Sequence, residues 1–248
     1  MVLTVLIAVL ALASGCGARG NAAEPVAGAP TVGTSLDAPV PASVLDAPLV
    51  DSHGRATTLG AFKGKVIVLS DVMTLCQESC PIITASMVSA AQDLDRTPAG
   101  RQVEFVSLTI DPTRDDGRHL RAYQRQFPHL PNWTVLTGSP RVVDQVWHTL
   151  GVWRHVTRLK PPLPHDWVTG APLTTDIAHT DELIFVNGSQ HFRYEMEGYG
   201  NVPTSAIPRR IYHFMDALGH RNASSPDPGS WSPAGVVEVL HWVLGSTQ

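Results

Sequence analysis

The sequence predicts an α/β domain in which parallel strands alternate with helices. Two near-continuous apolar runs, 65–72 and 103–110, are typical of strands buried on both faces. Between them, apolar side chains over 80–95 recur at helical spacing. Strand–helix–strand order of this kind implies right-handed crossovers and a sheet covered by helices.

Seven further segments have the periodicity of a helix or a strand. Helices are expected over 114–127, 139–150, 204–218 and 233–244. Strands are expected over 133–137, 182–187 and 191–197. The last two strands flank the turn residues Gly188 and Ser189 and so predict an antiparallel hairpin. The whole order is the outline of a thioredoxin-like domain, with central parallel strands closed by an antiparallel β-hairpin and helices on both faces.

Composition is that of an ordinary globular protein. Of the 248 residues, 43% are hydrophobic and 16% are charged, and 18 basic against 22 acidic residues give a net charge of −4. This length suits one well-cored domain with some tail. A nucleic-acid partner is not expected, because nucleic-acid-binding surfaces carry excess positive charge. Only three cysteines occur, which excludes a scaffold held by several disulfides.

The N-terminal residues have the pattern of an export signal. Residues 2–13 are apolar and uncharged, and they fall short of the roughly 20 residues that span a bilayer as a helix. Small residues then precede Cys16, which resembles a bacterial lipobox, where the signal is cut before a cysteine that receives lipid. We therefore expect a signal peptide over 1–15 and a lipoprotein anchored through Cys16 to the outer face of the bacterial cytoplasmic membrane. No Lys or Arg precedes the apolar run, so an uncut membrane anchor or plain secretion is the alternative.

The next stretch has the composition of a flexible linker. Residues 17–48 contain no aromatic side chain and no lysine, and they are rich in Ala, Gly, Pro and Val. Such a segment buries too little apolar surface to offset its chain entropy. The predicted organisation is a linker over 16–46, a folded domain over 47–219 and a C-terminal extension with a short helix over 220–248.

The chemistry is expected in the C-x-x-x-C segment that joins the first strand to its helix. Open α/β sheets collect their sites at the carboxyl ends of parallel strands. Cys76 and Cys80 face the same side if the turn is helical, and a helix N-terminus favours thiolates. Two such thiolates close a disulfide or hold a soft metal ion. A purely structural disulfide here would close almost no loop and stabilise little.

A third side chain distinguishes these roles. His179 immediately precedes the strand at 182–187, which we expect to be antiparallel to the strand at 65–72. His179 should therefore lie at the sheet edge that holds the cysteines, although a loop histidine is often simply solvated. Thiolates with an imidazole suit Cu(I) and also zinc. Asp111 leaves the second strand at the same edge, where it could orient a ligand from behind or cap the following helix.

The sequence resembles the Sco/SenC family of copper-binding, thioredoxin-fold proteins. The resemblance rests on C-x-x-x-C-P at 76–81, on VEFVSLTIDPTRD at 103–115, and on the strand that follows His179 and ends at a turn. It covers about residues 46–219. The chain departs from the family next to the first cysteine, where Ser70–Thr74 replaces an aromatic-Gly-Tyr-Thr run and Gln77 replaces the usual proline.

The resemblance implies that Cys76, Cys80 and His179 bind one copper ion, Cu(I) or Cu(II), with Asp111 near the site. It implies a role in assembling the binuclear copper centre of cytochrome c oxidase, as copper donor, as reductant of the target's cysteines, or both. The expected partner is thus the copper-accepting subunit of the oxidase or another cuproprotein.

The alternative function is an exported thiol–disulfide oxidoreductase in which Cys76 and Cys80 act as a redox pair without metal. A thiol peroxidase is disfavoured, because peroxiredoxins place a threonine three residues before the nucleophile, where this chain has Met73 or Gln77.

Overall fold

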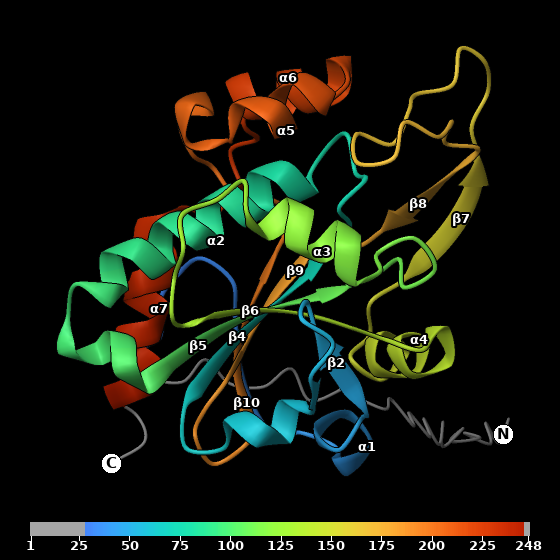
Figure 1. Cartoon of the computed structure of the whole chain (residues 1–248). Helices are drawn as coiled ribbons and strands as arrows, with labels where there is room; N and C mark the ends of the chain where they lie inside the picture. The colour runs from blue at the N-terminus through green and yellow to red at the C-terminus, as the bar shows by residue number, and fades with distance from the viewer. Residues whose placement is uncertain (1–27, 246–248) are drawn as a thin grey trace, which may run out of the picture.

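The computed structural model describes residues 28–245 and has an eight-stranded sheet at its centre (Figure 1). Its middle strands β4 (Val66–Val72), β5 (Val103–Thr109) and β6 (Trp133–Gly138) are parallel. The expected hairpin is formed by β9 (Glu182–Val186) and β10 (His191–Glu197), and β9 runs antiparallel to β4. The thioredoxin-like arrangement predicted from the sequence is therefore confirmed.

Helices cover both faces of this sheet. One face packs against α2 (Cys80–Asp95), α3 (Gly117–Gln124) and α7 (Pro233–Gly245). The other face packs against α1 (Ala42–Leu45) and α4 (Pro140–Thr149). Every residue of β4 is buried, and successive side chains alternate between the two cores, as the pleat of a strand requires.

Local sequence signals set the helix boundaries. The helix α2 spans the predicted residues, and Pro81 occupies its first turn, where a missing N–H costs no hydrogen bond. The helix α3 begins later than the periodicity suggested, because the Asp116 side chain accepts a hydrogen bond from the His119 N–H and so caps the helix. Ser139 caps α4 in the same way.

The folded unit begins earlier than the predicted boundary at residue 47. Within the expected linker, β1 (Thr34–Pro39) pairs antiparallel with β10 at the edge of the sheet, and α1 follows it. The linker prediction is therefore wrong over 34–45, because an edge strand gains its ladder from β10 and needs little apolar surface of its own. The predicted signal peptide (1–15) and Cys16 lie outside the described residues. Between residues 28 and 245 no helix has the length and apolar character needed to cross a bilayer.

The C-terminal region also differs from the prediction. A single helix over 204–218 is wrong: a short 3₁₀ turn (Thr204–Ala206) is followed by α5 (Arg209–Phe214) and α6 (Ala217–Ser224). The break follows from Met215, whose backbone is extended, and from Asp216, which caps α6. The expected extension over 220–248 contains α7, whose buried side chains belong to the main core beside α2.

Besides β1, four short strands were not predicted. Two of them, β2 (Leu49–Asp51) and β3 (Ala56–Thr57), extend the sheet beyond β6. The other two, β7 (Arg154–Arg158) and β8 (Thr175–His179), form a separate two-stranded ribbon. This ribbon positions the site, because β8 ends at His179.

Candidate metal centre

The two cysteines lie in the turn between β4 and α2. Cys76 is held by its backbone N–H, which donates to the Met73 carbonyl, while Cys80 is the first residue of α2. Both are free thiols, and only 7% of Cys76 and 0% of Cys80 is exposed. Both thiols are therefore largely shielded from solvent.

His179 reaches this pair from the ribbon. Its Nε2 atom lies 3.8 Å from the Sγ atom of Cys80, and 3% of its side chain is exposed. The topological argument from the sequence placed His179 at this sheet edge, and the structure has it there. The residue belongs to a strand rather than to a solvated loop.

The surroundings of His179 decide which ring nitrogen is available. Three oxygen atoms surround Nδ1: the Thr180 carbonyl at 3.1 Å, Asp71 Oδ2 at 3.4 Å and Asp181 Oδ1 at 3.5 Å. Because the Thr180 carbonyl can only accept, Nδ1 is the nitrogen that carries the proton, and in a neutral imidazole the lone pair is then on Nε2. That lone pair is directed at the cysteine side, as a metal ligand requires.

The two thiols differ in their acidity. A hydrogen bond from Cys80, together with the Glu78 N–H that lies 3.4 Å from Cys76 Sγ, lowers the pKa of Cys76. The same hydrogen bond to Cys76, together with burial, raises the pKa of Cys80 well above its ordinary value. Cys76 is therefore the first thiolate to form.

Two carboxyl groups, the buried Asp71 and the partly buried Asp181, lie behind the imidazole. Burial raises the pKa of Asp71 to about 7, although the charge of His179 acts in the opposite direction. Burial also disfavours the charged form of His179, but Asp71 and Asp181 outweigh it and raise the pKa of the imidazole. The Glu182 N–H donates to Asp71 at 3.1 Å and the Ser79 hydroxyl to Asp181 at 3.2 Å, so both carboxyl groups are held in place.

The donor atoms fit a soft metal ion. An imidazole nitrogen at ~2.0–2.1 Å and a thiolate at ~2.3 Å from one ion lie about 3.6–3.8 Å apart in tetrahedral or trigonal geometry. The observed separation between His179 Nε2 and Cys80 Sγ is 3.8 Å. Among the described residues, the ligand atoms of Asp71, Cys80, His179 and Asp181 all lie within 4.8 Å of one another. Cys76, the other predicted sulfur ligand, is not one of these four residues, and its Sγ accepts a hydrogen bond from the Glu78 N–H at 3.4 Å.

Asp111 does not take the position suggested for it. Its carboxylate pairs with the Arg114 guanidinium and accepts a hydrogen bond from the Thr113 hydroxyl at 2.8 Å. It caps no helix, since Asp116 caps α3, and the oxygens facing His179 belong to Asp71 and Asp181. Arg114, one turn further along, is the physical reason that Asp111 turns away.

Sequence reasoning missed Asp71 and Asp181. Asp71 gave a usable signal, because a carboxyl group inside a near-continuous apolar run is costly to bury and needs a partner. Asp181 gave less, since acidic residues in tight turns between strands are common. Neither carboxyl group could be placed next to His179 from the sequence, because this requires the register of β9 against β4.

A thioredoxin-like domain with a buried thiol pair beside a strand-borne imidazole defines a class of thiol- and metal-handling proteins. Within that class, the sequence model of the SCO1/SenC family matches residues 45–209. The chain belongs to this family.

Curated relatives match over part of their length. The human protein described as "Protein SCO2 homolog, mitochondrial" is 32% identical over 105 residues, which are 42% of this chain and 39% of that protein. "Protein sco1" of Schizosaccharomyces pombe is 33% identical over 98 residues, 40% of this chain and 36% of that protein. The matched segment thus spans less than half of either relative.

Solved structures support the fold over a larger share of the chain. Copper-bound ScoI of Arabidopsis thaliana has a TM-score of 0.51 at 18% identity and covers 74% of this chain and 97% of its own. Apo Sco1 of Thermus thermophilus has a TM-score of 0.54 at 18% identity, with 88% of this chain and 99% of its own covered.

Proposed function

We propose that this protein binds one copper ion through Cys76, Cys80 and His179 and delivers it to a copper-accepting protein. The observation that carries the proposal is the 3.8 Å between His179 Nε2 and Cys80 Sγ, which is the separation of two ligands on one ion. Two sulfurs and a neutral imidazole suit Cu(I) and also zinc. Copper in the Arabidopsis relative supports the choice of metal.

The proposed acceptor is the copper-binding subunit of cytochrome c oxidase, as the family membership suggests. Three ligands leave a copper ion open to a fourth. An incoming thiolate of the acceptor binds at the open position, and one protein sulfur then leaves, so the ion passes without being released to solvent. The proposed setting is the outer face of the bacterial cytoplasmic membrane, with a lipid on Cys16 as the tether.

A direct test is metal analysis of the reduced protein. Protein that lacks the predicted signal peptide (1–15) is incubated with Cu(I) and a competing chelator, then desalted. We expect about one copper per chain in the wild type, and loss of that copper in Cys76→Ser, Cys80→Ser and His179→Ala. His129→Ala, which changes an exposed histidine, is the matched control. Unchanged copper binding in His179→Ala would sink the proposed ligand set.

A second function is favoured by the unequal acidity of the thiols. Cys76, with its lowered pKa, is suited to attack a partner disulfide, and Cys80 is suited to resolve the mixed disulfide. In that exchange the partner's disulfide gains two electrons and Cys76–Cys80 becomes the disulfide. This activity needs no imidazole ligand, so it should persist in His179→Ala and disappear in Cys76→Ser.

A further inference from the structure

We propose that α5 and α6 form a clamp on the turn between the two cysteines, and that Gln77 is its positioning residue. The clamp consists of Phe214, Asp216 and Gly219, which contact Gln77, and of Arg210, which acts through Trp167. It sets how readily Cys76 is reached by a partner thiol. The proposal rests on the proposed thiol chemistry of this site and goes beyond it, because the SCO1/SenC match ends at residue 209 and most of the clamp lies after it.

The first contact is a pair of hydrogen bonds to Gln77. Its side-chain amide donates to the Phe214 carbonyl at 2.8 Å, and its own carbonyl accepts from the Asp216 N–H at 3.1 Å. Both the side chain and the backbone of one residue are thus held by the segment that joins α5 to α6. A proline at this position would lack the side-chain donor.

The second contact is the close approach of α6. A Cβ atom built on Gly219 would lie 2.1 Å from the Gln77 carbonyl oxygen and 3.1 Å from the Glu78 Cα atom. Real Cβ atoms do not occupy such positions, so only glycine allows α6 to rest on this turn. Gly219 also donates to Asp216 at 2.8 Å, which fixes the first turn of α6. In Figure 1, α5 and α6 lie beside the end of α2 that begins with Cys80.

The third contact holds the other side of the turn. The Arg210 guanidinium lies 5.2 Å from the Trp167 ring centroid and donates to the Trp167 carbonyl at 2.9 Å. The Trp167 indole N–H in turn donates to the Thr74 carbonyl at 2.9 Å. Thr74 is two residues before Cys76 and Gln77 is one residue after it. The clamp therefore fixes the backbone on both sides of the reactive thiol.

A fixed turn accounts for the burial of Cys76. This thiol is only 7% exposed although it lies in a turn and not in a regular element. Alkylating reagents and partner thiols need an approach path to sulfur, which a nearly buried thiol gives only when the turn opens. Loosening the clamp should raise the population of the open turn and hence the reaction rate of Cys76.

The test measures alkylation of Cys76 by iodoacetamide in the reduced, metal-free full-length chain. Peptide mass spectrometry assigns the label, so that Cys16 and Cys80 are counted separately. Gly219→Ala should speed labelling of Cys76 more than about tenfold, and Gln77→Ala about threefold to tenfold, as expected for one lost hydrogen bond. Gly229→Ala is the matched control, because a Cβ there meets nothing within 4 Å.

A propensity argument and a check of folding make the outcome clear. Alanine favours a helix interior over glycine, so a faster reaction in Gly219→Ala cannot come from weaker helix propensity. If Gly219→Ala does not fold, as judged by circular dichroism, Gln77→Ala decides alone. Labelling within twofold of the wild type in folded Gln77→Ala and Gly219→Ala would overturn the clamp. Because this assay contains no metal, it remains valid if the copper proposal fails.

Discussion

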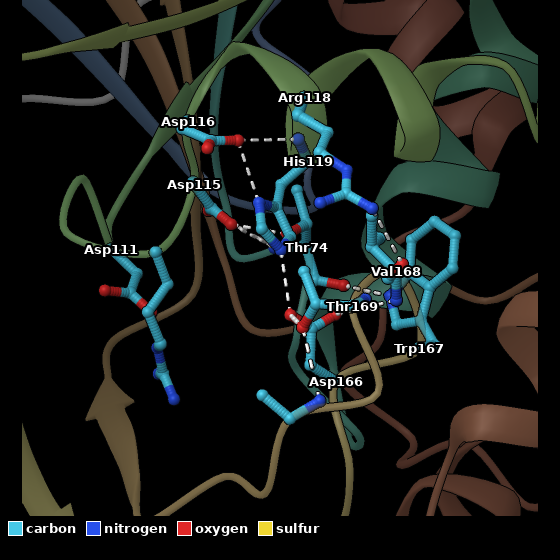
Figure 2. A network of polar contacts seen from close by, with 12 residues as sticks. Thr74, Asp111, Asp115, Asp116, Arg118, His119, Asp166, Trp167, Val168 and Thr169 are labelled. Carbon is cyan, nitrogen blue, oxygen red and sulfur yellow. Dashed lines mark hydrogen bonds and ion pairs between the residues drawn. The ribbon is translucent and has the colours of Figure 1, made fainter.

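Two buried histidines show how differently one side chain is used in this molecule. Figure 2 shows His119 joined to Asp116 and Asp166. The distances are 2.8 Å from Nδ1 to Asp116 Oδ1 and 2.9 Å from Nε2 to Asp166 Oδ2. His179 has oxygen atoms around Nδ1 only, and its Nε2 faces a sulfur at 3.8 Å. Both imidazoles are mostly buried, so burial alone does not separate them.

The difference lies in the free lone pair. Both nitrogens of His119 donate to carboxylates, which requires the imidazolium form and leaves no atom for a metal. The Asp166 carboxylate belongs to the loop between β7 and β8, so His119 ties α3 to that loop. His119 is therefore a structural ion pair, whereas His179 keeps one nitrogen for a ligand. Saturation of both ring nitrogens distinguishes the two roles.

The largest expected effect is on stability at His119. His119→Ala leaves the Asp166 carboxylate buried without its cation, and breaking a buried pair of this kind costs about 3–5 kcal/mol. His179→Ala should cost less than half of that in metal-free protein, because the carboxyl groups behind it can take up protons. Urea unfolding of the reduced protein measures both, with His129→Ala as the exposed control. Equal losses in the two buried variants would contradict the comparison.

The next effect is a pH dependence centred on the same ion pair. Burial opposes ionisation of Asp166, but hydrogen bonds from Thr169, His119 and the backbone lower its pKa to about 2. Its stabilisation is present above the unfolded value near 3.8 and is lost as the pH falls towards 2. From these two values the loss is about 2 kcal/mol.

On the alkaline side the sign is reversed. Burial disfavours the charged form of His119, yet Asp166 and Asp116 raise the pKa of this imidazole above its ordinary value of 6.5. Its stabilisation is full below pH 6.5 and declines as the pH rises through the raised pKa. Subtracting the profile of Asp166→Asn from that of the wild type removes contributions common to both, such as that of Asp115, whose pKa burial raises to about 7. A difference that stays flat from pH 2 to 9 would contradict this account.

The sequence predicted the interior of this fold better than its borders. Every residue of β4 and most residues of α2 are buried, so their hydrophobic patterns are nearly complete. The strands β1 and β8 are short and largely polar, and partners distant in the sequence hold them in place. Propensity contains no information about such partners, and this explains the wrong linker boundary.

The candidate site was likewise predicted in part. The C-x-x-x-C spacing identified Cys76 and Cys80. The expected order of the strands placed His179 at the same sheet edge. The orientation of carboxyl groups depends on register and on competing cations, which the sequence does not reveal. For this reason the sequence analysis placed Asp111 beside the ligands, whereas Asp71 and Asp181 are the residues that lie there.

The smallest expected effect therefore compares Asp71 with Asp111. Asp71→Asn keeps the size of the side chain and an oxygen acceptor but removes the charge that faces His179 Nδ1. Loss of such a support typically weakens metal binding by 10–100-fold, and we expect the lower end, about tenfold or ~1.4 kcal/mol. Competition with a Cu(I) chelator measures it, and nitrogen NMR of His179 reports whether the Nδ1–H tautomer persists.

Asp111→Asn is the counterpart. It weakens the pair with Arg114, whose guanidinium also donates to the Thr175 carbonyl at the start of β8, so a small effect can reach His179 along the strand. We expect copper affinity to change by less than about threefold, since no oxygen of Asp111 faces the imidazole. If Asp111→Asn weakened copper binding more than Asp71→Asn did, the carboxyl group that supports His179 would have been misassigned.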